Sequence, residues 1–118
     1  MIRTLATCLL LAAFFAPMSA RANSAIAHCH ISDLAVASLP SGELRTLMED
    51  PALLDFYRSG SIFPDVAYAQ DVGELEILHW EPFYDAVVQH IRINHPPPFD
   101  DEESRQLVAF LMGAVSHS

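Results

Sequence analysis

The sequence predicts an all-α protein, and three observations lead to this class. Apolar residues recur at intervals of three and four positions in several segments, a spacing that places them on one face of a helix. Proline and acidic residues stand where helices begin, at Asp50-Pro51, at Pro82 and at Asp100-Asp101. Nine consecutive positions, 107 to 115, carry no charge, which indicates a helix that is buried on most sides.

The first half of the chain predicts three helical segments. The first helix is expected over about residues 25 to 39, where Pro40-Ser41-Gly42 follows an apolar face made by Ile31, Leu34, Ala35 and Leu39. A second segment covers Glu43 to Glu49. Asp50 then caps a run that starts at Pro51, continues through Tyr57 and is closed by Gly60.

The second half of the chain predicts a loop and two longer helices. The stretch from Ser61 to Glu76 has no sustained period and is expected to be a loop. Pro82 occupies a first-turn position of a helix that ends near Asn94, before three consecutive prolines. The last helix is expected to begin at Asp100 or Asp101, whose carboxylates complement its amino-terminal dipole, and to run to the end.

The amino terminus has the pattern of a secretory signal peptide. Arg3 lies in a short basic region, an apolar stretch follows from Leu5 to Ala16, and Ala20-Arg21-Ala22 is a small-x-small cleavage signal. The apolar stretch is shorter than the roughly 20 residues that a membrane-spanning helix requires, so no transmembrane anchor is expected after processing. The chain therefore divides into a signal peptide, 1 to 22, and one domain, 23 to 118, which is secreted or periplasmic.

The charge of the processed chain bears on its partners. Removal of residues 1 to 22 leaves four arginines and no lysine against 15 acids, a formal charge of −11. Such a field repels nucleic acids and anionic lipids over about 8 Å in physiological salt. Nucleic acid is therefore not the first choice of partner, and a phosphate-bearing substrate would need a local cation such as a metal ion.

Helical position separates the histidines. At about 100° per residue, His28 falls within the face made by Ile31, Ala35 and Leu39, whereas His30 points about 200° away from His28. His117 shares a face with Phe110 and Ala114. Taken singly, each has a structural explanation: His28 as a hydrogen-bonded core histidine, His117 in helix packing, Asp65 as a turn residue and His79 as a cap.

Several short motifs resemble a known family. Phe-Pro-Asp at 63 to 65, His-Trp-x-Pro-Phe at 79 to 83 and Leu-Val-Ala-Phe-Leu-x-Gly at 107 to 113 resemble the zinc-dependent phospholipase C family, and within it the amino-terminal catalytic domain of glycosylphosphatidylinositol-specific phospholipase D. The resemblance covers about residues 24 to 118. It implies the amino-terminal part of a multi-helix domain like those of zinc phospholipase C and P1 nuclease, and an exported zinc-dependent phosphodiesterase acting on phospholipid or glycosylphosphatidylinositol.

The resemblance also implies a metal site. The family's aspartate and two histidines that match Asp65, His79 and His117 bind one zinc ion, and the histidine that matches His28 binds another. Three such ligands and a water complete a catalytic zinc site. Further family ligands, an aspartate, histidines and a glutamate beyond His117, have no counterpart here, and Asn23 stands where bacterial members have a tryptophan ligand. We therefore expect at most one well-held zinc ion in this chain, bound by Asp65, His79 and His117 with little contribution from His28. As an amino-terminal fragment, the chain is expected to have no activity by itself.

Two other functions remain open at this level. One is a zinc nuclease specific for single strands, which an assay of both substrates separates from a phospholipase. The other is a non-catalytic, exported helical protein that keeps part of the scaffold and binds metal.

Overall fold

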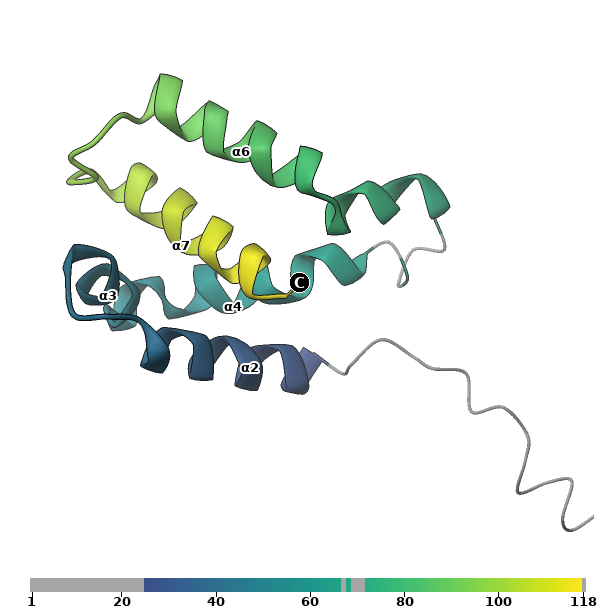
Figure 1. The fold of residues 1–118 in the computed structure, drawn as a ribbon, viewed down its shortest axis with the longest axis horizontal. Helices are drawn as coiled ribbons and strands as arrows, with labels where there is room; N and C mark the ends of the chain where they lie inside the picture. The colour runs from purple at the N-terminus through teal and green to yellow at the C-terminus, as the bar shows by residue number, and fades with distance from the viewer. Residues whose placement is uncertain (1–24, 67, 69–71, 118) are drawn as a thin grey trace, which may run out of the picture.

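The computed structural model describes residues 25–66, 68 and 72–117, and every regular element within them is helical (Figure 1). This confirms the all-α class, whereas membership of a larger multi-helix domain stays a prediction. The expected signal peptide and Asn23 lie outside the described residues. The α-helices are α2 (Ala25–Ser38), α3 (Glu43–Met48), α4 (Leu54–Ile62), α6 (Glu81–Asn94) and α7 (Glu102–Ser116), and the 3-10 helices are η1 (Pro51–Leu53), η2 (Phe63–Asp65) and η3 (Gly73–His79).

Local sequence signals set the helix starts as expected. The Asp50 carboxylate accepts a hydrogen bond of 2.9 Å from the Ala52 amide, and Pro51 follows as the first residue of η1. The Asp101 carboxylate likewise accepts a 2.8 Å hydrogen bond from the Ser104 amide at the start of α7. Each carboxylate thus satisfies an amide that has no partner inside the first helical turn.

Helices α4 and α7 make the principal contact of the fold, and two glycines form it. A Cβ atom on Gly60 would lie 2.0 Å from the Phe110 carbonyl oxygen, and one on Gly113 would lie 1.9 Å from the Tyr57 carbonyl oxygen. The two backbones therefore approach more closely than any other residue would allow. The prediction that Gly60 closes its helix is wrong, since α4 continues through Gly60 to Ile62 and uses the glycine for packing.

The expected loop from 61 to 76 is wrong over much of its length. The end of α4 passes directly into η2, where Pro64 is tolerated because it lies in the first turn. After the segment around Tyr68, η3 begins at Gly73 and is held against the fold by the buried Leu78. Short 3-10 turns have no apolar period of 3.6 residues, which is why the search for helical periodicity missed them.

The inner face of α2 also differs from the expected one. His28 is buried as predicted, but Ile31 and Leu34 are 43% and 55% exposed, and Ser32 is completely buried. The Ser32 hydroxyl lies 2.5 Å from the Ser116 hydroxyl on α7, and its carbonyl accepts a hydrogen bond from the Tyr57 hydroxyl on α4. A small polar residue therefore occupies the point where three helices meet, because a larger side chain would separate them.

The core beside this junction is small. It consists of Met48, Leu53, Tyr57 and Ala109, with partly buried apolar residues of α2, α3 and α7 packed around it. As expected for α7, every residue from 107 to 114 is buried or half-buried, although Val115 is 45% exposed. None of the described helices combines the length and the apolar character needed to cross a membrane.

Candidate metal centre

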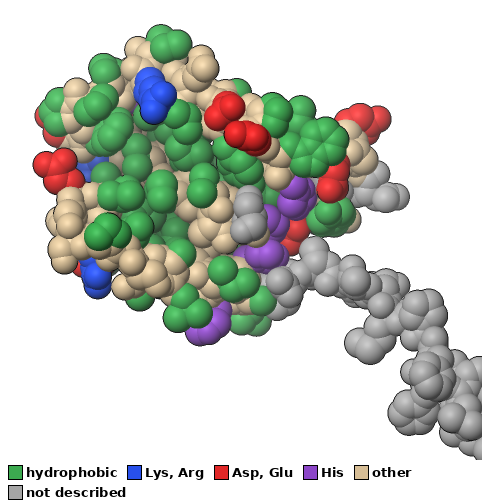
Figure 2. Space-filling view, viewed as in Figure 1, with side chains coloured by type: hydrophobic (Ala, Val, Ile, Leu, Met, Phe, Trp, Pro, Cys, Tyr) green, Lys and Arg blue, Asp and Glu red, His purple; other side chains and the backbone are tan. Residues whose placement is uncertain are grey.

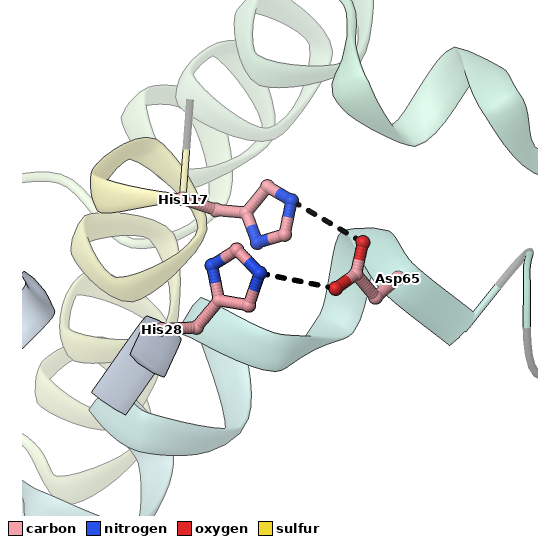
Figure 3. Close-up of side chains that lie close together, drawn as sticks. All are labelled: His28, Asp65 and His117. Carbon is pink, nitrogen blue, oxygen red and sulfur yellow. Dashed lines mark ion pairs between the residues drawn. The ribbon is translucent and has the colours of Figure 1, made fainter. Parts of the chain in front are cut away.

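The chain brings residues from four separate segments to one end of the helix bundle. His28 lies on the first turns of α2, Asp65 ends η2, His79 ends η3, and His117 caps the carboxyl end of α7. Figure 3 shows His28 and His117 side by side, each directed at the Asp65 carboxylate. The α4–α7 contact positions two of these residues, because η2 follows α4 directly and His117 follows α7.

Asp65 is the geometric centre of the group. Its Oδ2 lies 3.1 Å from His28 Nε2, and its Oδ1 lies 3.4 Å from His79 Nε2 and 3.5 Å from His117 Nε2. One ligand atom from each of His28, Asp65 and His117 lies within 4.8 Å of the other two. A tetrahedral zinc ion with bonds of about 2.0 to 2.1 Å separates its ligand atoms by about 3.4 Å. The separations of 3.4 and 3.5 Å match that spacing, and the 3.1 Å between His28 and Asp65 lies between it and the roughly 2.8 Å of a charge-assisted hydrogen bond.

His28 carries the strongest sign of a missing partner. Its side chain is 6% exposed, yet neither of its ring nitrogens makes a hydrogen bond among the described residues. The Nε2 atom faces Asp65 without the geometry of a hydrogen bond, although it is close enough for an ion pair. Burying a polar group without a hydrogen-bond partner costs several kcal/mol when it is measured as transfer from water into a hydrocarbon. In proteins the cost is about 1 to 3 kcal/mol. A metal ion in front of Nε2 would supply that partner.

His117 is held in the form that a metal ligand needs. Its Nδ1–H donates a 2.8 Å hydrogen bond to the Ser61 carbonyl, which leaves the Nε2 lone pair free toward Asp65. Burial lowers the pKa of His117 below its usual value, and the neighbouring His28 lowers it further, while the hydrogen bond to Ser61 opposes this. The lowered pKa favours the neutral ring, which can donate an electron pair.

His79 closes the other side of the group. Its ring packs edge-on against His117, with centroids 5.1 Å apart, and its Nδ1 has no hydrogen-bond partner in the described part of the chain. On its outer side lies the Tyr68 ring, whose hydroxyl donates to Glu76 at 3.2 Å. His79 is 19% exposed, so it forms the boundary between the buried carboxylate and solvent.

The structure thus brings together all four residues named from the sequence. The compact group contains His28 with Asp65 and His117, whereas the resemblance implies one ion at Asp65, His79 and His117 and another at His28. The assignment of these residues as metal ligands stays a prediction. His30, which was expected to point away from His28, is exposed, and so is His90; both lie outside the group. The Ser61 carbonyl was not anticipated, because the sequence gives no signal for a backbone acceptor.

The comparisons with known proteins give relatives for about half of the chain. It is 45% identical over 69 residues to phosphatidylinositol-glycan-specific phospholipase D of Bos taurus and 41% identical over 71 residues to that of Homo sapiens. The corresponding Mus musculus protein is 39% identical over 71 residues. Each match covers 53% of this chain but only 8% of the relative's length. No family model matches the chain, and no solved structure does.

Proposed function

We propose that the group around Asp65 binds zinc and serves the hydrolysis of a phosphodiester in a phosphatidylinositol-glycan or another phospholipid. One observation carries this proposal: three imidazole Nε2 atoms converge on a single, largely buried carboxylate. The similarity to phosphatidylinositol-glycan-specific phospholipases D over half the chain supports the choice of substrate. Because the match spans only 8% of those proteins, their whole activity is a proposal for this chain.

The donor set supports zinc over calcium and magnesium. Imidazole nitrogen with carboxylate oxygen suits zinc, whereas calcium and magnesium prefer sites made of oxygen alone. The buried Nε2 of His28, which makes no hydrogen bond among the described residues, fits an ion at this position, and so does the tautomer of His117 that Ser61 selects. We assign His28, Asp65 and His117 as the ligands, with His79 beside them on the solvent side.

The chemistry follows from what such an ion supplies and what the chain adds. When bound, zinc would lower the pKa of a water molecule toward 7 and neutralise the charge of a phosphodiester. The Asp65 carboxylate would balance part of the ion's charge, and the Ser61 carbonyl keeps His117 from turning. The acidic surface of the chain otherwise repels phosphate, so a cation at this point would determine where a phosphodiester binds.

A graft tests the catalytic part of the proposal. In the bovine phospholipase D, the region that corresponds to residues 25–117 of this chain is replaced by those residues, so that His28, Asp65 and His117 are all transferred. Hydrolysis of phosphatidylinositol-glycan is then measured with zinc and with chelator. We expect chelator-sensitive activity that is lost with Asp65→Asn and retained with Glu43→Gln, a change of an exposed acid on α3 remote from the centre.

Other results would favour the alternatives. A folded, zinc-binding graft without hydrolysis would support a non-catalytic metal-binding protein. Preferential cleavage of single-stranded DNA would support the nuclease. The 118-residue chain by itself is expected to bind zinc without turnover, and chelator-sensitive hydrolysis by it would contradict that expectation.

A further inference from the structure

The 3-10 helix η3 sorts its side chains into three rows. Residues three apart are eclipsed in a 3-10 helix, so every third residue lies on the same side. One row contains Leu75 and the buried Leu78, which hold the turn against the fold. A second row contains Glu76 and His79, which face Tyr68 and Asp65. The third row is Glu74, Ile77 and Trp80, and the hydrogen bond from the Trp80 amide to the Ile77 carbonyl, 3.0 Å, extends the turn to its last member.

The third row is exposed and mostly apolar. Ile77 is 46% exposed and Trp80 56% exposed, although residues of these types are usually buried. Because the row is adjacent to the one that carries His79, it borders the candidate metal centre. Figure 2 shows histidine side chains at the surface beside hydrophobic and acidic ones. The buried Leu78 fixes the turn, so the exposure of Ile77 and Trp80 does not result from fraying of a chain end.

The charges around this row are of one sign. Between residues 72 and 89 the acids are Glu74, Glu76, Glu81 and Asp85, and the segment contains no lysine or arginine. A nucleic acid or an anionic membrane would be repelled here. A zwitterionic lipid surface, by contrast, presents its ammonium groups outermost. Those groups would meet the carboxylates of Glu74 and Glu81, while the tryptophan ring offers a face to the cation and an amphipathic body that suits the membrane interface.

We propose that the row Glu74–Ile77–Trp80 docks the chain onto a zwitterionic phospholipid surface beside the metal centre. Ile77 and Trp80 enter the headgroup region, and Glu74 and Glu81 remain at the level of the ammonium groups. The proposal extends the proposed function from the metal site to the surface on which a lipid substrate would be met. The docking proposal can fail independently of the proposed function, because docking by this row requires neither zinc nor hydrolysis.

The only tryptophan of the chain reports the docking directly. The expected processed chain, residues 23 to 118, is titrated with phosphatidylcholine vesicles while chelator is present and the emission of Trp80 is followed. We expect saturable binding with a shift of the emission to shorter wavelength, and quenching when the vesicles contain brominated lipids. Replacing part of the phosphatidylcholine by phosphatidylserine should weaken the binding.

Two matched variants complete the test. Ile77 is 46% exposed, so docking would bury about half of its side chain. Ile77→Ser removes the apolar part of that contact and should weaken vesicle binding about tenfold. Ile93→Ser, at the far end of α6, changes a residue that is 74% exposed and should leave binding within about twofold of the parent chain. All versions begin at Asn23, so the apolar stretch from Leu5 to Ala16 does not contribute to vesicle binding. Absence of a Trp80 shift, equal losses in both variants, or tighter binding to anionic vesicles would overturn the proposal.

Discussion

Substitution of Gly113 by alanine tests the helix contact on which the candidate centre depends. The new Cβ would lie 1.9 Å from the Tyr57 carbonyl oxygen, whereas ordinary contact begins at 3.4 Å, so α4 and α7 must separate by about 1.5 Å. Overpacking of this kind costs about 1 to 3 kcal/mol, and the upper end applies because a helix backbone cannot rotate away. The higher helix propensity of alanine offsets about 1 kcal/mol of this cost. We therefore expect a net loss of about 2 kcal/mol in the free energy of unfolding, measured by urea denaturation followed by circular dichroism.

The same separation of α4 and α7 should also weaken metal binding at the candidate centre. The Ser61 carbonyl, next to Gly60, accepts the 2.8 Å hydrogen bond from His117, and moving the helices apart would break it. Loss of such a supporting hydrogen bond weakens metal binding by about 10 to 100-fold. Gly73→Ala is the control, because a Cβ there meets nothing within 4 Å and should change stability by less than about 0.5 kcal/mol. Equal unfolding midpoints for the two variants would refute the reasoning.

Three further outcomes follow from the described contacts. Tyr57→Phe should lower the free energy of unfolding by about 1 to 2 kcal/mol, because it removes the buried hydroxyl that donates to the Ser32 carbonyl. Urea denaturation measures this loss, with Phe56→Tyr, a change at an exposed neighbour, as the control. Burial lowers the pKa of His117, so in the absence of zinc this histidine takes up a proton near pH 6.5 in the unfolded chain more readily than in the folded one. The free energy of unfolding should therefore fall as the pH is lowered from 7 to 5, and a pH-independent unfolding midpoint would contradict this. Mass spectrometry of exported material should find Asn23 as the first residue, and a mature form that keeps the apolar stretch would contradict the signal peptide.

The elements that the sequence predicted correctly are those with strong local signals. Asp50 at the start of η1 and Asp101 at the start of α7 act through hydrogen bonds to amides within three residues, so local sequence is enough to predict both starts. Gly60 was misread for the opposite reason. Its meaning depends on Phe110, fifty positions away, and a local rule that reads glycine as a helix end has no access to that contact.

The candidate centre shows the same division. The types of residue, one carboxylate and several imidazoles, and their family-like motifs were visible in the sequence. The resemblance also implied that Asp65, His79 and His117 lie together, but not that His28 joins Asp65 and His117, because the place of His28 depends on how closely α2 approaches α7. Buried Ser32 and its contact with Ser116 set that approach, and a serine within an apolar segment gives no sign of such a role. The Ser61 carbonyl that orients His117 could be found only from coordinates.

Zinc titration of the chain tests the central claim most directly. After removal of metal and dialysis, isothermal titration calorimetry should show one zinc ion per chain, with affinity reduced at least tenfold by His28→Ala, Asp65→Asn or His117→Ala. His79→Ala should have a smaller effect, and His90→Ala, at an exposed position outside the centre, none. Zinc binding that is absent, or that survives the first three substitutions unchanged, would contradict a metal centre built around Asp65.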